Sequence, residues 1–248
     1  MEEKVIRELT GHSGSKIYLM KDEEHTFIRK VGNIERNFER ISQLYSECYP
    51  VPIIYQQYDD VLDMEYIHGL DMKQYLLSGS LNNLSSFIID TLNKFAKKSV
   101  VKDYTEVYNQ KLAWMDSAVD LPFCKEELIM KLPKRLPQSM YHGDMTLENI
   151  IHADDSFYMI DAVSIEYDSY IFDIAKMRQD LECKWFLRKT NLRFDVRLSN
   201  LQEKIVTRFP GSDNDYLLIL MLLRVYLHTQ PGDSDREFIL REIKRLWK

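Results

Sequence analysis

The chain has 248 residues, of which 45% are hydrophobic and 29% charged, a composition typical of a folded globular protein rather than a disordered one. Its 33 basic and 39 acidic residues give a formal net charge of -6, so no overall positive field is available to attract nucleic acid. No apolar run approaches the roughly 20 residues that cross a bilayer, and the charged start is not signal-like, so we expect a cytoplasmic protein without membrane partners.

The first 66 residues have the pattern of a small sheet with one helix. Strand-like runs at 16–20 and 26–31 predict a hairpin, and two further strands are expected at 53–57 and 61–67. Between the two pairs, a helix is expected to begin after the capping residue Asn33. Its predicted inner face consists of five apolar residues at helical spacing: Ile34, Phe38, Ile41, Leu44 and Tyr45.

The rest of the chain has mainly helical periodicity. Helices are expected at 71–78, 85–98, 105–118, 125–132, 173–189, 199–208, 214–228 and 235–247. This change of pattern predicts an α+β protein with two lobes, one small and β-rich at 1–66 and one mainly helical at 67–248, joined by a hinge at about 64–69.

The cysteines indicate neither a disulfide framework nor a zinc site. Cys48, Cys124 and Cys183 are odd in number and widely spaced, with no CxxC pair. We expect free thiols in or near the core.

One short stretch interrupts the helical half. The sequence His142-Gly-Asp144-Met-Thr-Leu-Glu-Asn149 is followed by two apolar runs that flank a polar turn, and the second run ends at Asp161. A hairpin of this kind places Asn149 at its start and Asp161 at its end, so two oxygen ligands are expected to converge beside Asp144. Hard oxygen ligands without cysteine suit Mg²⁺.

This block resembles the catalytic loop of the aminoglycoside and choline phosphotransferase superfamily, whose pattern is HGDxxxxN followed by a strand ending in Ile-Asp. The resemblance implies a protein-kinase-like fold and transfer of the γ-phosphate of ATP to a hydroxyl of a small molecule. It implies that Asp144 orients the acceptor hydroxyl and accepts its proton, and that His142 braces the loop. Asn149 and Asp161 are then expected to hold Mg²⁺ against the ATP phosphates.

The resemblance also assigns ATP-binding residues to the first lobe. Gly11, Ser13 and Gly14 lie in a segment that could cover the phosphates through backbone N–H groups, although a tight turn is the alternative interpretation. Lys30 is expected to meet the α- and β-phosphates. Strand alternation puts the neighbouring Arg29 on the opposite face, and the sequence favours Lys30 without deciding which of the two points inward.

Two further ATP-lobe features follow from the family pattern. Glu39, or Glu35 one turn earlier, is expected to pair with Lys30 from the following helix. The segment from Met64 to Gly69 resembles the hinge, in which main-chain groups near Glu65 and Ile67 hydrogen-bond adenine.

No regulatory activation loop is expected after Asp161. Ala162-Val163-Ser164 replaces the Phe-Gly of protein kinases, and no Ala-Pro-Glu follows before the helix that contains Asp173. Asp173 itself is interpreted as a helix cap that also braces the catalytic loop.

The acceptor is less defined, because relatives phosphorylate aminoglycosides, choline, ethanolamine and sugars. Residues 174–209 contain 9 basic and 4 acidic residues, which favours a neutral or anionic metabolite such as a sugar, in a role such as cell-envelope polysaccharide synthesis. The alternative is that Arg178, Lys184, Arg188 and Lys189 cover solvated helix faces.

Three other functions stay open at this point. Choline, ethanolamine or an aminoglycoside are alternative acceptors, and an aromatic cage for a quaternary ammonium group has four candidate residues: Tyr167, Tyr170, Trp185 and Phe186. Helical spacing favours core packing as the use of these side chains. A catalytically silent nucleotide-binding module is the third alternative.

Overall fold

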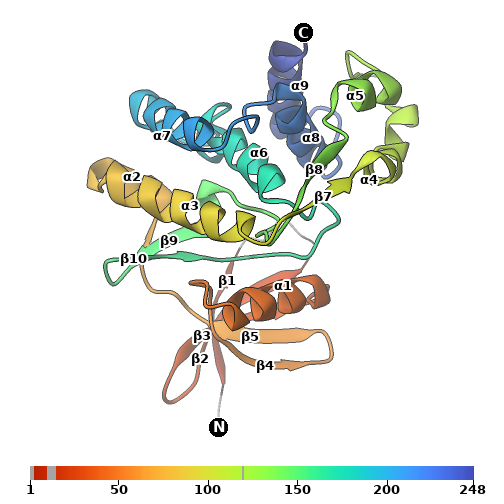
Figure 1. Ribbon diagram of the computed structural model, residues 1–248. Coiled ribbons are helices and arrows are strands. Elements are labelled where there is room, and N and C mark those ends of the chain that lie inside the picture. The colour runs from red at the N-terminus through yellow and green to blue at the C-terminus, as the bar shows by residue number, and fades with distance from the viewer. Residues whose placement is uncertain (1–2, 10–14, 119) are drawn as a thin grey trace. The chain divides into compact units, whose positions relative to one another are not determined.

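The computed structural model describes residues 3–9, 15–118 and 120–248 (Figure 1). The chain forms two compact units. The first unit comprises Met1–Gly79, His142–Asp144 and Glu148–Ile165, and the second comprises Ser80–Tyr141, Met145–Leu147 and Glu166–Lys248. The first unit thus contains the loop and hairpin that the two-lobe division assigned to residues 67–248, and that division stays a prediction.

The first unit is built on a five-stranded antiparallel sheet with the strand order β1-β2-β3-β5-β4. Its strands are β1 (Lys4–Leu9), β2 (Lys16–Lys21), β3 (Thr26–Val31), β4 (Ile54–Tyr58) and β5 (Val61–Glu65). Both expected hairpins are present, and β1 was not expected. Because β3 is the middle strand, Lys30 lies opposite Ile17 on one side and Leu62 on the other.

Helix α1 (Glu35–Ser46) follows β3 and packs against the sheet (Figure 1). Its buried stripe differs from the predicted one: Phe38 and Tyr45 are exposed, whereas Asn37 and Arg40 are buried with Ile34, Ile41 and Leu44. Ile34, without a side-chain bond, occupies the N-cap position that we expected for Asn33. The face is therefore rotated, and it carries a polar residue into the interior.

A second, three-stranded sheet completes the first unit, in the order β10-β9-β6. It consists of β6 (Leu70–Asp71), β9 (Ile150–Ala153) and β10 (Ser156–Met159), and α2 (Met72–Ser78) follows β6. The expected hairpin β9–β10 turns through Asp154 and Asp155, both at positive φ, as a two-residue hairpin turn requires. This hairpin sets Asn149 and Asp161 at its two ends.

The second unit is mainly helical. It contains α3 (Leu81–Ala96), α4 (Thr105–Lys111), α5 (Lys125–Lys131), α6 (Tyr170–Leu181), α7 (Asp195–Arg208), α8 (Asp215–Tyr226) and α9 (Ser234–Leu246), with a two-stranded ribbon of β7 (Val100–Asp103) and β8 (Arg135–Gln138). Helix α8 packs against both α6 and α9. A β-sheet region followed by a mainly helical one confirms the α+β prediction.

Several predicted helix ends are wrong for local reasons. Helix α6 begins earlier than expected because Ser169 caps it, and it ends at Leu181, before Lys184 takes a left-handed conformation with φ of 61°. Asp173 is therefore not a helix cap; it is buried within the first turns of α6. The expected helix at 105–118 is divided into α4 and a 3-10 helix at Ala113–Ser117.

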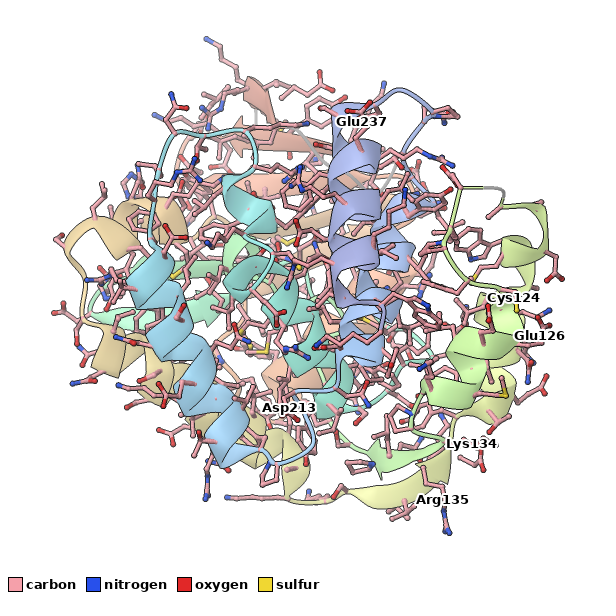
Figure 2. The ribbon with its side chains drawn as sticks, turned by 90° about the horizontal axis from the view of Figure 1, so that it is seen from above. Cys124, Glu126, Lys134, Arg135, Asp213 and Glu237 are labelled. Atoms are coloured by element: carbon pink, nitrogen blue, oxygen red, sulfur yellow. The ribbon has the colours of Figure 1, made fainter. Side chains whose placement is uncertain are left out.

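The cysteines are free thiols, as expected, but only Cys183 is buried. Cys48 and Cys124 are exposed, and Figure 2 shows Cys124 at the beginning of α5. None of the helices that the structure describes has the length and apolar character needed to span a membrane.

Candidate active site

Lys30 and Asp161 meet inside the first unit. Lys30 is 2% exposed, and its Nζ lies 2.8 Å from Asp161 Oδ1. Arg29 lies on the other face of β3 and pairs with Asp63 through two bonds of 2.7 Å. The preference for Lys30 as the inward residue is thus confirmed, and a cation at this depth requires the carboxylate beside it.

Helix α1 also reaches Asp161, through an asparagine. Asn37 Nδ2 donates to Asp161 Oδ1 at 3.1 Å and to the carbonyl oxygen of Ala162 at 2.8 Å. The neighbouring Arg36 binds the same segment further along. Its Nε donates to Ser164 O, and its carbonyl oxygen accepts from Ser164 N. The sequence analysis did not identify Asn37. The pattern that could have indicated it is a polar residue on the helix face that also carries Ile34, Ile41 and Leu44.

The expected pair between Lys30 and Glu39 is wrong. Both Glu39 and its alternative Glu35 are exposed on α1. Among the residues that the structure describes, Asp161 is the only carboxylate paired with Lys30. The inward position of the helix is occupied by Asn37, so neither glutamate can reach the lysine without rotating the helix.

Asp144 and Asn149 lie together at the start of the hairpin. Asn149 Nδ2 donates to the carbonyl oxygen of Asp144 at 2.8 Å and to its carboxylate Oδ2 at 3.2 Å. Ile160 N donates to Asn149 O at 2.9 Å, which ties the start of the hairpin to the residue before Asp161. The hairpin thus brings Asp144, Asn149 and Asp161 into one unit. The convergence of Asn149 and Asp161 on a metal stays a prediction.

His142 is completely buried behind this loop. Its Nδ1 accepts a hydrogen bond from Asp144 N at 3.3 Å, which assigns the ring proton to Nε2. Burial lowers the pKa of His142 to about 4, against smaller opposing effects of Asp144 and Asp161. The imidazole is neutral near pH 7 and acts as a brace.

The backbone at position 143, in the loop that carries Asp144, has room only for glycine. Its φ is +91°, and a Cβ at this position would lie 2.0 Å from the carbonyl oxygen of Val163. Val163 N in turn donates to His142 O at 3.0 Å. The segment after Asp161 therefore lies directly against the loop that carries Asp144.

The donor set fits a magnesium ion. The oxygen donors are Asp161 Oδ2 and Asn149 Oδ1, neither of which has a hydrogen-bond partner among the described residues. Within the same part of the chain no group of three His, Cys, Asp or Glu side chains could hold a metal by itself. Mg²⁺ suits such a sparse set, because it keeps several waters and takes further ligands from substrate phosphates.

The segment expected to bind adenine has main-chain groups that a ligand could use. Glu65 ends β5, and its N–H donates to Ile53 O at 2.8 Å. In the described portion of the chain, the N–H and C=O of Ile67 form no hydrogen bond, so both remain available to a ligand. Gly11, Ser13 and Gly14 lie outside the described residues.

The four basic residues singled out at 174–209 are engaged in ion pairs. Arg178 is buried and pairs with Glu182 at 2.7 Å and Asp215 at 2.9 Å. Lys184 pairs with Asp195, and both Arg188 and Lys189 pair with Asp235. All four are paired with carboxylates, Arg188 and Lys189 sharing one, so these residues give no support to an anionic acceptor.

The candidate aromatic cage is also wrong. Tyr167 packs against Tyr108 and Phe172, whereas Tyr170 packs against Phe209. Trp185 is buried beneath the guanidinium of Arg188, 3.6 Å from its ring centroid. These rings belong to separate packing clusters.

Asp180 is a further residue that the sequence did not reveal. It is fully buried on α6; its Oδ2 accepts from Leu147 N at 2.7 Å, and its Oδ1 accepts from Phe186 N at 3.1 Å. Leu147 stands between Asp144 and Asn149 in the chain, so this bond holds the middle of that segment. The bracing role expected of Asp173 stays a prediction.

The comparison with solved structures identifies the fold. A putative fructosamine-3-kinase from Haemophilus somnus 129PT is similar, with a TM-score of 0.64 and 14% identity over 100% of this chain and 92% of that one. The choline kinase from Streptococcus pneumoniae has a TM-score of 0.57 and 14% identity over 99% and 93% of the two chains. The aminoglycoside phosphotransferase APH(4)-Ia, in a ternary complex with ADP and hygromycin B, has a TM-score of 0.63 and 9% identity over 97% and 92%.

The chain therefore has the protein-kinase-like fold of the aminoglycoside phosphotransferase and choline kinase superfamily, and the resemblance in its sequence is confirmed at the level of the fold. No protein-family model matches the chain, and no curated protein sequence does.

Proposed function

We propose that the chain is a cytoplasmic, ATP-dependent phosphotransferase that moves the γ-phosphate of ATP to a hydroxyl of a small molecule. The observation that carries this proposal is the meeting of a buried lysine with Asp161, in the unit that also holds Asp144 and Asn149. The similar folds of small-molecule kinases, one of them in a complex with ADP, support it.

Each site residue has a role in this reaction. Lys30 binds the α- and β-phosphates, and the free backbone groups of Ile67 bind adenine. Asp144 orients the acceptor hydroxyl and takes its proton as the oxygen attacks the γ-phosphorus; the bond from that phosphorus to the β–γ bridging oxygen breaks, and ADP leaves. Asn149 and Asp161 hold Mg²⁺, which neutralises phosphate charge when it is bound.

The acceptor that we propose is a neutral hydroxylated molecule such as a sugar or sugar derivative. Arg178, Arg188 and Lys189 are held in ion pairs with carboxylates, which argues against a site built for an anionic acceptor. The dispersed aromatic rings offer no cage to a quaternary ammonium group. The similarity to a putative fructosamine-3-kinase supports the same class.

The test is a screen of ATP consumption over sugars, sugar derivatives, hydroxy acids, choline, ethanolamine and aminoglycosides, with Asp144→Asn as the inactive control. Asp144→Asn should keep nucleotide affinity and lose on the order of 10³-fold in transfer, because the carboxylate both orients and deprotonates the hydroxyl. Near-normal turnover by this variant contradicts the catalytic role. A preference for choline or an aminoglycoside contradicts the proposed acceptor only.

A second variant tests the metal ligands. Asp161→Ala should abolish the gain in ATP affinity that Mg²⁺ provides to the wild type in calorimetry. Equal Mg²⁺ dependence in the two proteins contradicts the assignment of Asp161. A wild-type protein that binds ATP without hydrolysing or transferring it, whatever the acceptor, is a nucleotide-binding module instead.

A further inference from the structure

The inner face of α1 presents an amide where the family resemblance led us to expect a carboxylate. Asn37 is 5% exposed, and its single amide nitrogen serves both Asp161 Oδ1 and the carbonyl oxygen of Ala162. The two acids nearest to it on the helix, Glu35 and Glu39, are exposed. Lys30 and Asn37 therefore converge on the same oxygen of Asp161.

This convergence fixes the direction of the Asp161 carboxylate. Oδ1 accepts from Lys30 at 2.8 Å and from Asn37 at 3.1 Å, which leaves Oδ2 for another ligand. Asp161 also has a φ of 56°, a strained conformation for a residue with a side chain. The bond from Asn37 to Ala162 O holds the backbone immediately after this strained residue.

We propose that Asn37 is a positioning residue that keeps Asp161 directed at the metal when Lys30 turns to the nucleotide phosphates. The inference rests on the proposed function. Arriving phosphates compete for the lysine, whereas the neutral amide has no charge to be drawn to them, so it stays on Oδ1. A glutamate in this place would set a second negative charge against Asp161, which explains why a neutral donor occupies it.

The experiment compares Asn37→Leu, which removes the donor at similar size, with Asn83→Leu, the same change at an exposed position on α3. ATP affinity is measured by calorimetry in EDTA and in Mg²⁺. Asn37→Leu should keep its affinity in EDTA within about twofold and lose at least tenfold of the gain from Mg²⁺, because only the orientation of Asp161 is lost. Asn83→Leu should match the wild type in both conditions.

Two further variants make the result decisive. Asn37→Ser keeps a polar group in the interior but is too short to reach both acceptors; it should show the same selective loss if Asn37→Leu does not fold. Glu39→Gln tests the rival lysine–glutamate pair and should change neither affinity. An unchanged Mg²⁺ gain in both Asn37 variants, or a tenfold loss of affinity in EDTA caused by Glu39→Gln, overturns the proposal.

A measurement without nucleotide separates this proposal from the proposed function. In urea unfolding, Asn37→Leu and Asp161→Ala should be coupled by on the order of tenfold in the unfolding equilibrium constant, because they remove the two ends of one hydrogen bond. Additive effects overturn the positioning role. A wild type without Mg²⁺-dependent ATP binding overturns the proposed function, and the coupling then still decides whether Asn37 positions Asp161.

Discussion

Burial keeps the imidazole of His142 neutral, and this gives the protein a pH-dependent stability. The pKa of His142 falls from 6.5 to about 4 in the folded state. Between these values the unfolded chain binds a proton that the folded chain does not, so stability decreases as the pH falls through this window. We expect His142 to account for a loss of about 2 kcal/mol between pH 7 and pH 5, measured by urea unfolding.

The control for this pH effect is a second histidine. His142→Gln should flatten the slope between pH 7 and pH 5, whereas His25→Gln, at an exposed position, should preserve it. Equal slopes in the wild type and the His142 variant would show that folding does not lower the pKa of the ring.

Gly143 is expected to tolerate no side chain. Gly143→Ala combines a positive φ with a 2.0 Å approach to Val163 O, so backbone must move at the loop that carries Asp144. We expect a stability loss of about 2–4 kcal/mol and a transfer rate lower by at least tenfold. The matched variant is Gly211→Ala, which has a φ of +84° but no atom within 4 Å of the added Cβ, and it should lose only about 1 kcal/mol. Similar losses at the two positions would contradict the steric argument.

Some residues of the candidate site could be predicted from the sequence, and others could not. Spacing alone placed Asp144, Asn149 and Asp161 together, because a two-residue hairpin turn fixes which residues stand at its ends. The partner of Lys30 could not be predicted in this way. Asn37 and Asp161 are 124 residues apart in sequence, and no local pattern distinguishes a buried asparagine that holds a carboxylate from a solvated one.

Ion pairs join the helices of the second unit. Some of them use basic residues that the sequence had suggested for binding the acceptor. Arg178 on α6 bonds Glu182, Asp215 and the carbonyl oxygen of Asn214, which links α6 to the start of α8. A buried guanidinium with three acceptors has a structural role. Its removal takes the nearest cation from Glu182 and Asp215, which keep only the longer pairs with Arg245 and Lys248.

Arg178→Met is therefore expected to lower the free energy of unfolding by about 3 kcal/mol while the acceptor KM stays within twofold. The exposed Arg208→Met is the matched control and should be close to wild type in both. Urea unfolding and steady-state kinetics at a temperature where both variants are folded provide the two readouts. A raised acceptor KM with unchanged stability would restore the original idea of a basic acceptor site.

Elements with a strong apolar period were predictable, and short or exposed ones were not. Strand β1 is exposed along almost its whole length, so it has no alternating pattern and is defined only by pairing with β2. The two residues of β6 are a strand only because β9 lies beside them. In α1 the period was correct but its phase was not, because Asn37 and Arg40 are buried in place of Phe38 and Tyr45.

At the scale of the molecule, the chain passes between the two units several times. Residues 142–144 and 148–165 complete the first unit, where β9 pairs with β6 and Asp161 pairs with Lys30. The first unit is thus not a contiguous segment.

We expect the fragment 1–79 to be unfolded when it is expressed alone, because it lacks these strands and would bury Lys30 without a carboxylate. Circular dichroism and proton NMR dispersion report the folded fraction. Adding the fragment 80–248 should restore structure, since it supplies the missing hairpin. A cooperative thermal transition of 1–79 alone would contradict the expectation.

The connection from Asp161 to α6 is short and held at both ends. Ser164 bonds Arg36 through its N–H and its carbonyl oxygen, and the Asp168 carboxylate accepts bonds from Lys102, Tyr104 and Gln138. Kinases that are switched by phosphorylation swing such a segment in and out of place. Here the segment between Asp161 and α6 is bonded at Ser164 and at Asp168. If the proposed function is correct, we expect its rate to be independent of phosphorylation in this segment.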